Sequence, residues 1–136
     1  MSDSDAVPTL STSTARAYDL RVLAQFAPEK RVRRKLFKTE QLWSEMVCYE
    51  PGQSTVMHHH PYEEEQFVIV SGTATMNVGG DEITLAAGTV LLIGATVPHD
   101  VRNLGKERLV IAFTKVPTRL AKHAREQHGN AVHPIT

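Results

Sequence analysis

The sequence predicts an all-β protein, either a sandwich or a barrel built from many short strands. Apolar runs rich in β-branched residues recur at short intervals, and turn signals with glycine separate them, as at Gly79-Gly80-Asp81. The middle of the chain contains no long stretch with helical periodicity. With 136 residues, of which 41% are hydrophobic and 22% charged, the chain has the size and composition of one folded domain.

The first expected strand is Leu42–Glu50, which ends at the turn pair Pro51-Gly52. Ser54–His60 follows as the second strand. Gln66–Ser71 is strongly apolar and ends at Gly72, so we expect a third strand there.

The second half of the chain continues in the same way. Thr73–Val78 alternates and is rich in β-branched residues, and the glycine turn after it predicts a hairpin with Ile83–Ala86. Thr89–Ile93 is expected as a buried strand and His99–Asn103 as a short one. Arg108–Val116 is the last predicted strand.

The two ends of the chain have a different composition. Residues 1–15 are rich in Ser, Thr and Asp, which predicts a disordered tail before a β-barrel domain at residues 16–117. Pro117 ends the last strand, and residues 118–136 are expected to form a short helix and a tail, because Thr118–His128 has a helical composition.

The charge and hydropathy of the chain argue against a nucleic-acid-binding, a membrane-spanning or a secreted protein. The net charge of +0 argues against a nucleic-acid binder, and the basic run Lys30–Lys35 is interpreted as a solvated edge or loop. No apolar run approaches the length of a membrane span, and the first residues lack the apolar segment of a secretory signal. We therefore expect a cytoplasmic protein. Cys48 is the single cysteine and is expected to be a buried small hydrophobe.

Two clusters of residues fit a single metal site. His58 and His60 are two positions apart and would share one face of a strand, and Glu65 could return on the next strand after a turn. His99 would add a third imidazole. Three imidazoles and a carboxylate suit one divalent transition metal, with Fe, Mn, Ni, Co, Cu and Zn all possible. His59 lies on the opposite face, and Glu64 could replace Glu65 if the register shifted by one.

The spacing of these residues resembles the cupin superfamily over residues 36–117. The first motif is Gly52-x5-His58-x-His60-x4-Glu65-x6-Gly72, and the second is Gly88-x5-Gly94-x-Thr96-x2-His99-x3-Asn103. The resemblance implies a small jelly-roll barrel (a double-stranded β-helix), the metal ligands His58, His60, Glu65 and His99, and a homodimer. Gly94 and Thr96 stand where the family usually has Pro and Gly, which leaves the shape of that turn open.

Alternation along the strands predicts the wall of a pocket around the metal. Asp100 and Arg102 would face outward. The wall would be mostly apolar, with no inward Arg or Lys, which disfavours a phosphorylated or strongly anionic substrate. Its expected members are Ser54, Val56, Phe67, Ile69 and Val101, with Met46, Tyr49, Met76 and Phe113 as further candidates.

Three functions fit this site. The first is a metal-dependent dioxygenase, an oxidoreductase that acts on a small, largely apolar, enolic or aromatic substrate. The second is a redox-neutral isomerase, lyase or decarboxylase, in which Glu65, Tyr49 or Tyr62 would act as acid or base. The third is a non-catalytic barrel that binds a small molecule or a metal. An apolar cavity would favour the first, an acid or base near the metal the second, and a filled barrel the third.

Overall fold

The computed structural model describes residues 4–118 and contains, within them, twelve strands and one short helix, α1 (Leu20–Leu23). The strands are β1 (Ser4–Asp5), β2 (Leu10–Ser11), β3 (Arg16–Ala17), β4 (Val32–Lys38), β5 (Trp43–Tyr49), β6 (Ser54–His58), β7 (Glu63–Ser71), β8 (Thr73–Val78), β9 (Asp81–Ala86), β10 (Val90–Ile93), β11 (His99–Arg102) and β12 (Leu109–Pro117). The predicted C-terminal helix lies outside the described residues. No helix among those described is long and apolar enough to cross a membrane.

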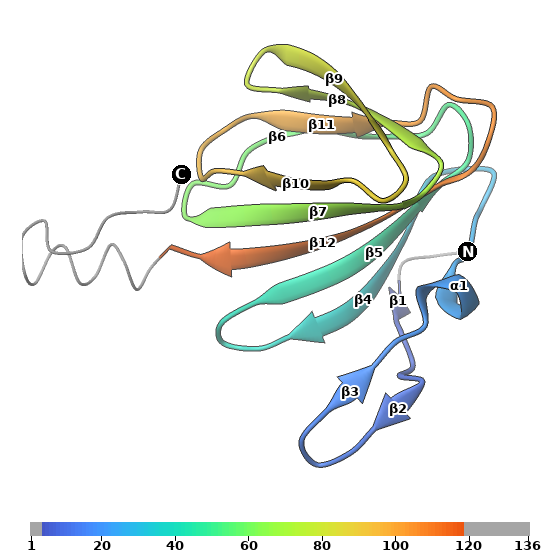
Figure 1. Cartoon of the computed structure of the whole chain (residues 1–136), viewed down its shortest axis with the longest axis vertical. Helices are drawn as coiled ribbons and strands as arrows, with labels where there is room; N and C mark the ends of the chain where they lie inside the picture. Colours follow the sequence, from blue (N-terminus) through green and yellow to red (C-terminus); the bar gives the residue numbers. More distant parts are fainter. Residues whose placement is uncertain (1–3, 119–136) are drawn as a thin grey trace, which may run out of the picture.

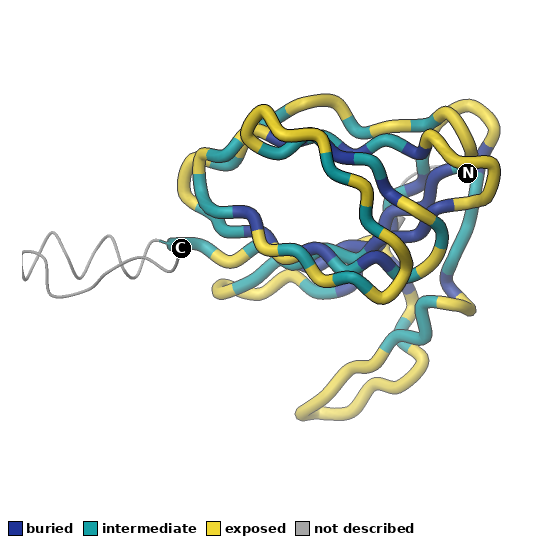
Figure 2. The backbone as a smooth tube through the Cα atoms, turned by 45° about the horizontal axis from the view of Figure 1, so that its top comes forward, coloured by how far each residue is buried: buried dark blue, intermediate teal, exposed yellow. Residues whose placement is uncertain are grey.

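Two sheets face each other around one core. The six-stranded sheet has the order β1-β4-β5-β12-β7-β10, and the four-stranded sheet has the order β6-β11-β8-β9 (Figure 1). From β5 to β8, each strand lies in the opposite sheet from the one before it. In Figure 2 the two layers form the sides of a flattened ring of backbone. The expected jelly-roll, or double-stranded β-helix, is therefore confirmed.

The eight strands predicted from the sequence are all present. Their ends shift by at most three residues, the largest change being β7, which begins at Glu63 instead of Gln66. Inward-facing side chains from both sheets fill the space between the layers. The buried members of this inner core are Val47, Tyr49, Phe67, Ile69, Ala74, Met76, Ile93, Val101, Leu109 and Ile111.

A second apolar cluster covers the outer face of the six-stranded sheet. Its buried members are Ala6, Leu23, Ala27, Val32, Leu36, Met46, Cys48 and Val110. Cys48 is thus a buried small hydrophobe, as expected. The prediction that Met46 lines the pocket is wrong. Neighbouring residues of a strand point to opposite faces, so Val47 and Tyr49 face inward and Met46 faces outward.

The N-terminal segment differs from the disordered tail expected at residues 1–15. From Ser4 onward it is structured: β1 pairs in parallel with β4, and β2 forms a hairpin with β3 that projects from the barrel (Figure 1). Ala6 donates its amide proton to the carbonyl of Lys35 at 2.9 Å and is buried in the outer cluster. The exposed edge of β4 supplies backbone partners that the composition of the tail does not reveal.

The basic run Lys30–Lys35 is largely a strand and not the solvated edge or loop that was expected. Val32 and Arg34 face the outer cluster, where Arg34 is 8% exposed and donates to the carbonyl of Leu23. Arg33 points to the opposite face and makes a two-pronged ion pair with Glu45, at 2.9 and 3.0 Å. Alternation, which holds for charged residues as for apolar ones, therefore directs Arg33 to the inner side of the sheet.

Gly72 joins β7 to β8 in a conformation that side chains disfavour. Its φ is +80°, and a Cβ at this position would lie 2.3 Å from the carbonyl oxygen of Arg108. Gly52 has a similar φ of +89°, but a Cβ there would meet no atom within 4 Å. Alanine substitutions at the two positions therefore distinguish two contributions to the loss of stability: the strained backbone alone at Gly52, and the strained backbone together with a steric clash at Gly72.

We expect Gly72→Ala to lower the free energy of unfolding by about 3 kcal/mol or more, since left-handed backbone and overpacking both contribute. Gly52→Ala should cost only about 1–2 kcal/mol, from the backbone alone. Urea unfolding followed by circular dichroism measures both. Equal losses in the two variants would contradict the close packing of Gly72 against β12.

Candidate metal centre

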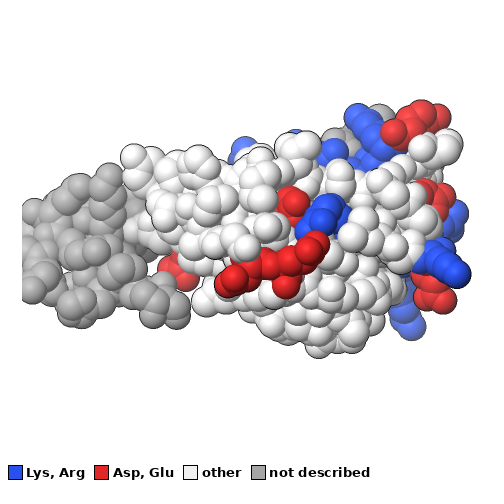
Figure 3. Space-filling model, turned by 90° about the horizontal axis from the view of Figure 1, so that it is seen from above, with Lys and Arg blue, Asp and Glu red and all other residues white. Residues whose placement is uncertain are grey.

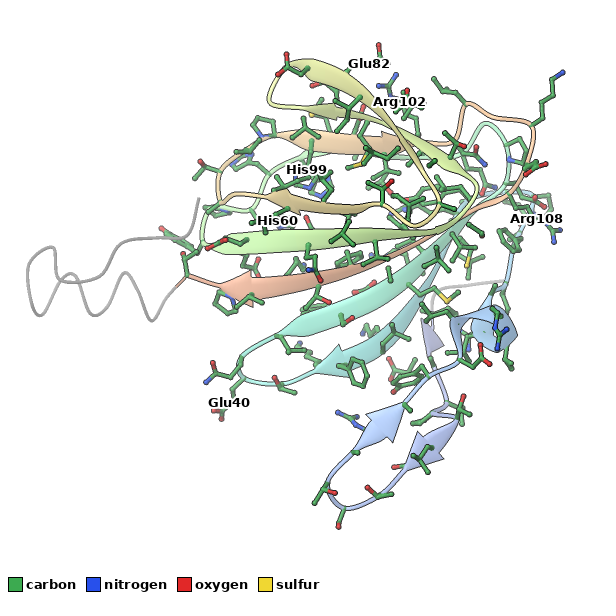
Figure 4. All side chains as sticks on the ribbon, in the orientation of Figure 1. Glu40, His60, Glu82, His99, Arg102 and Arg108 are labelled. Atoms are coloured by element: carbon green, nitrogen blue, oxygen red, sulfur yellow. The ribbon has the colours of Figure 1, made fainter. Side chains whose placement is uncertain are left out.

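Three strands and one loop bring the predicted ligands together. His58 ends β6 and His99 begins β11, and the two residues are direct neighbours across that antiparallel pair. Glu65 lies on β7 in the facing sheet, and His60 lies in the connection between β6 and β7. Figure 4 shows His60 and His99 between the two layers. The sequence reasoning identified all four positions, because the two motifs preserve their spacing.

A bulge in β6 sets which side chains face the pocket. Thr55 pairs with Val101 and His58 pairs with His99, so three steps on β6 match two on β11. Thr55 and His58 therefore both face inward, although their spacing is odd. Ser54, which was predicted to share the face of His58, is exposed instead, and Val56 is 77% exposed at the rim of the pocket.

The ligand atoms of His58, His60, Glu65 and His99 all lie within 4.8 Å of one another. His99 Nε2 is 2.9 Å from Glu65 Oε1, and His60 Nε2 is 3.3 Å from the same oxygen. Glu65 and His99 are buried, whereas His58 and His60 are half-buried and His59 is exposed. The cluster therefore has one closed side, at Glu65 and His99, and one more accessible side.

Hydrogen bonds to the backbone occupy the Nδ1 atoms of His58 and His99, so their Nε2 atoms remain free to act as acceptors within the cluster. His58 Nδ1 lies 2.7 Å from the carbonyl oxygen of Val56, and His99 Nδ1 lies 2.9 Å from that of Val97. A carbonyl only accepts, so both Nδ1 atoms donate and both Nε2 atoms carry lone pairs in the neutral rings.

Buried lone pairs then face one another. His60 Nε2, His99 Nε2 and Glu65 Oε1 are buried without a hydrogen-bond partner. Such groups repel at these distances and are costly to bury, unless a cation or a proton lies between them. The donor set of three imidazole nitrogens and one carboxylate oxygen fits Fe, Mn, Co, Ni, Cu or Zn. These residues therefore fit one divalent transition metal ion.

Burial and the nearby charge of Glu65 act in opposite directions on the pKa values of His60 and His99. Burial lowers the pKa of His60 below the usual value, more strongly than the charge of Glu65 raises it. Burial also lowers the pKa of His99, but it is outweighed by Glu65, to which Nε2 can donate once the ring is protonated, and by the Val97 carbonyl, so the pKa is raised. A proton on His99 is therefore the main competitor of a metal ion.

A pocket of about 290 Å³ opens beside the cluster. His58, His60 and Glu65 reach its surface, so an ion held by the cluster would face this space. The volume is at the small end of the range for ligand sites. The other lining residues are Arg31, Arg33, Val47, Tyr49, Thr55, Val56, Phe67, Val101, Ile111, Phe113 and Lys115.

The expectation of a wall without inward Arg or Lys is wrong. Arg31, Arg33 and Lys115 all line the pocket. The signal for Lys115 was present in the sequence, because Lys115 is two positions from Phe113, which was predicted to face inward. The two arginines were missed because their strand was interpreted as a solvated edge. Met76, another expected wall residue, is buried in the inner core but is not among the lining residues.

The two candidate tyrosines lie in different places. Tyr49 lines the pocket, and its hydroxyl is 2.7 Å from the hydroxyl of Thr55. Burial raises the pKa of Tyr49 far above its usual value, so the phenol stays protonated at neutral pH. Tyr62 is 57% exposed and does not line the pocket, so its position gives no support to the predicted acid or base role.

The turn before His99 ties the two motifs together. Thr96, which stands where the resemblance led us to expect glycine, has a left-handed backbone with a φ of 72°. Its amide donates to the carbonyl of His60 at 2.8 Å. Asn103 closes the far end of β11, where its side chain donates to the carbonyls of Tyr49 and Glu107. Asn103 is thus a structural residue that fixes β11, and with it His99.

Asp100 and Arg102 point away from the pocket, as expected. Arg102 pairs with Glu82 at 2.8 Å and with Asp100 at 3.3 Å. Figure 4 shows Arg102 and Glu82 together near β8 and β9. Figure 3, which views the molecule from that side, shows small groups of acidic and basic side chains with uncharged surface between them.

Comparison with known proteins adds a family and several relatives. The model of the family described as "Cupin domain" matches residues 45–115. The chain is 33% identical over 72 residues to polyketide synthase CurC of Streptomyces cyaneus, covering 53% of this chain and 47% of that protein. It is 25% identical over 67 residues to tetracenomycin polyketide synthase protein TcmJ of Streptomyces glaucescens, covering 49% and 45%. The chain thus matches about half the length of these relatives.

Solved structures agree on the architecture. TT1209 from Thermus thermophilus superposes with a TM-score of 0.70 at 28% identity, over 73% of this chain and 94% of that one. A protein with a double-stranded β-helix domain from Klebsiella pneumoniae gives a TM-score of 0.73 at 20% identity, over 81% and 92%. The second likeness shows the fold alone.

We expect His99→Ala to lower metal affinity at least about 100-fold, because it removes the most buried ligand of the cluster. His59→Ala is the matched control, since His59 is exposed and adjacent to two ligands in sequence. Elemental analysis after dialysis measures the metal content of both variants. About one metal ion per chain in wild type and His59→Ala, and none in His99→Ala, is the expected result. Equal metal content in all three would contradict the site.

Metal affinity should also fall on acidification. The pKa of His99 is raised, so its proton competes with the metal at a higher pH than the proton of an ordinary histidine would, and the loss of affinity should approach tenfold per pH unit below the pKa. Above the pKa of His99 the affinity should become constant. Competition for zinc with a coloured chelator between about pH 5 and 8 measures the profile. A flat profile over this range would contradict ligation by His99.

Proposed function

This chain belongs to the cupin domain family, whose model matches residues 45–115, and from this premise we propose that it is a metal-dependent enzyme for a small enolic or aromatic substrate. Dioxygenase chemistry is the reaction we infer first. The observation that carries the proposal is the pocket of about 290 Å³ directly beside the four-residue cluster. A filled interior would have favoured a non-catalytic barrel.

The side chains of the pocket suit such a substrate. Val47, Phe67, Ile111 and Phe113 give it an apolar wall that excludes water and can hold a ring or a conjugated chain. Phe67 and Phe113 lie side by side, with ring centroids 6.0 Å apart. Such a wall would orient a flat substrate with its oxygen atoms toward the polar cluster.

The cluster itself would supply the reactive end of the site. A redox metal held by these three imidazoles and one carboxylate would supply Lewis acidity toward an enolate or catecholate oxygen, and electrons for chemistry with dioxygen. His58 and His60 would hold it on the accessible side, and Glu65 and His99 on the buried side. The carbonyls of Val56 and Val97 fix the rings of His58 and His99 in the tautomer that binds.

The curated relatives support a substrate of this kind. Both CurC and TcmJ carry the words polyketide synthase in their names. Chains with alternating ketones enolise readily and cyclise to phenols, so both enolic and aromatic oxygens occur in this chemistry. An oxygenated molecule of this general kind, small enough for the pocket, is the substrate class that we propose.

A redox-neutral reaction is the second candidate, and Tyr49 is the observation that favours it. The Tyr49 phenol stays protonated and lies in the pocket, so it could donate a hydrogen bond to a substrate oxygen and stabilise negative charge there without a change of oxidation state. Glu65 would then be the acceptor among the remaining groups. This candidate requires turnover without dioxygen, whereas the first requires its consumption.

We expect iron-loaded protein to consume dioxygen with members of a panel of catechols and enolisable ketones. His58→Ala should lower the initial rate at least about 100-fold, because it removes one of the four residues proposed to hold the iron. His59→Ala should keep the wild-type rate, because it leaves the cluster intact. An oxygen electrode measures the rate, and chromatography detects the product. Turnover of the same compounds under nitrogen would instead support the redox-neutral candidate.

A further inference from the structure

We propose that the pocket binds a small organic carboxylate, whose carboxylate group is held by the guanidinium of Arg31 while its second oxygen function faces the metal cluster. The inference rests on the proposed function, because it names the substrate class of the same pocket. It reverses the expectation from the sequence, which disfavoured an anionic substrate. The cationic side chains that line the pocket carry the argument.

Arg31 lies at the inner face of the sheet, directly before β4. Val32 pairs with Cys48 across β4 and β5, so Arg31 lies beside Tyr49, one residue further along each strand. Both residues line the pocket. The Tyr49 and Thr55 hydroxyls, 2.7 Å apart, provide further polar groups there.

Arg31 has an unsatisfied donor. Its Nε atom is buried and has no hydrogen-bond partner. Within residues 4–118 no carboxylate forms an ion pair with Arg31, in contrast to Arg33, whose guanidinium is held by both oxygens of Glu45. A half-buried guanidinium without an anion is costly, and a planar carboxylate fits its two parallel donors.

Lys115 adds a second positive charge at the metal end of the pocket. It lies opposite Glu65 across β12 and β7, and opposite Trp43 across β12 and β5. Its ammonium lies 4.6 Å from the centre of the Trp43 ring, and no carboxylate in the described part of the chain pairs with it. Arg33 and Glu45 cancel, and the two charges of Arg31 and Lys115 exceed the single negative charge of Glu65, so the pocket is positive even before a metal cation is added.

The dimensions favour one small acid. The backbones of β7, which carries Glu65, and β4 are three strands apart in the sheet, a span of about 14 Å at the usual spacing, and side chains from both project inward. The space left between them suits a molecule with one acidic group at Arg31, a second oxygen at the cluster, and an apolar body between them. The apolar body would lie on the wall that includes Phe67 and Phe113.

Benzoate and its neutral isostere benzamide test the subsite, because they share a ring and differ in charge. Isothermal titration calorimetry on the full chain, stripped of metal with a chelator, isolates Arg31 from the metal cluster. We expect benzoate to bind at least about tenfold more tightly than benzamide, as for one charge-assisted hydrogen-bonded pair. Arg31→Met should abolish this preference, and Arg31→Lys should retain part of it.

Two further variants control for charge and folding. Arg16→Met removes an exposed cation on β3, outside the pocket, and should leave the preference unchanged. Arg31→Gln is a second neutral variant whose amide can still hydrogen-bond, in case Arg31→Met fails to fold. Thermal unfolding of each variant verifies that the barrel is intact.

Equal binding of benzoate and benzamide to wild type, or no binding of either, would overturn the proposal. So would a preference that persists in Arg31→Met and Arg31→Gln, or tighter binding of inorganic phosphate than of benzoate. The metal content of the same preparations, measured before chelation, separates the two proposals. A bound metal without carboxylate preference overturns only the subsite, whereas the preference without metal binding overturns only the proposed enzyme.

Discussion

The convergence of bare acceptor atoms inside the barrel is the constraint on which this site depends. Two imidazole nitrogens, on His60 and His99, and one oxygen of Glu65 are buried without partners, close to one another. Elsewhere in a protein interior such groups would be paired or excluded. The backbone carbonyls that accept from His58 and His99 keep the lone pairs directed at this point. A cation or a proton at this point would remove the cost of burying these acceptors together.

The double-layered fold makes this convergence possible. The consecutive strands β6 and β7 lie in opposite sheets, so the segment from His58 to Glu65 crosses from one layer to the other within a few residues. The pairing of β6 with β11 then adds His99 from a segment far away in sequence. The bulge in β6 and the close contact of Thr96 with the carbonyl of His60 fix the angles at which the ligands meet. Small changes in these supports would move the ligands.

Cationic side chains line the pocket together with the apolar ones. Because successive side chains of a strand point to opposite faces, Arg33 and Lys115 share the inner face with apolar residues. The wall of the pocket is therefore apolar but carries positive charge. Glu45, fully buried, neutralises Arg33 and receives a further short hydrogen bond from Trp43. Arg31 has no such carboxylate partner in the described part of the chain, so its positive charge is not neutralised. An apolar wall and an unpaired guanidinium beside the four-residue cluster are the observations behind the proposed substrate, a small acid with a conjugated body.

The sequence by itself determined the all-β class, the eight strands of the barrel and the four residues that the structure brings together in one cluster. Strand alternation and the fixed spacing of the two motifs are local properties, so they can be read along the chain. The ordered segment from Ser4 onward could not be predicted in this way, because its structure depends on the free edge of β4.

Tertiary structure alone decided which polar residues reach the pocket. Ser54 was predicted inside and lies outside, because the bulge that reverses its face arises from pairing with β11. Arg31 was predicted in solvent and lines the pocket, because it directly precedes β4, whose pairing with β5 turns this side of the segment toward the cavity. Local pattern fixes the order of faces along a strand, whereas pairing between strands fixes which face meets the cavity.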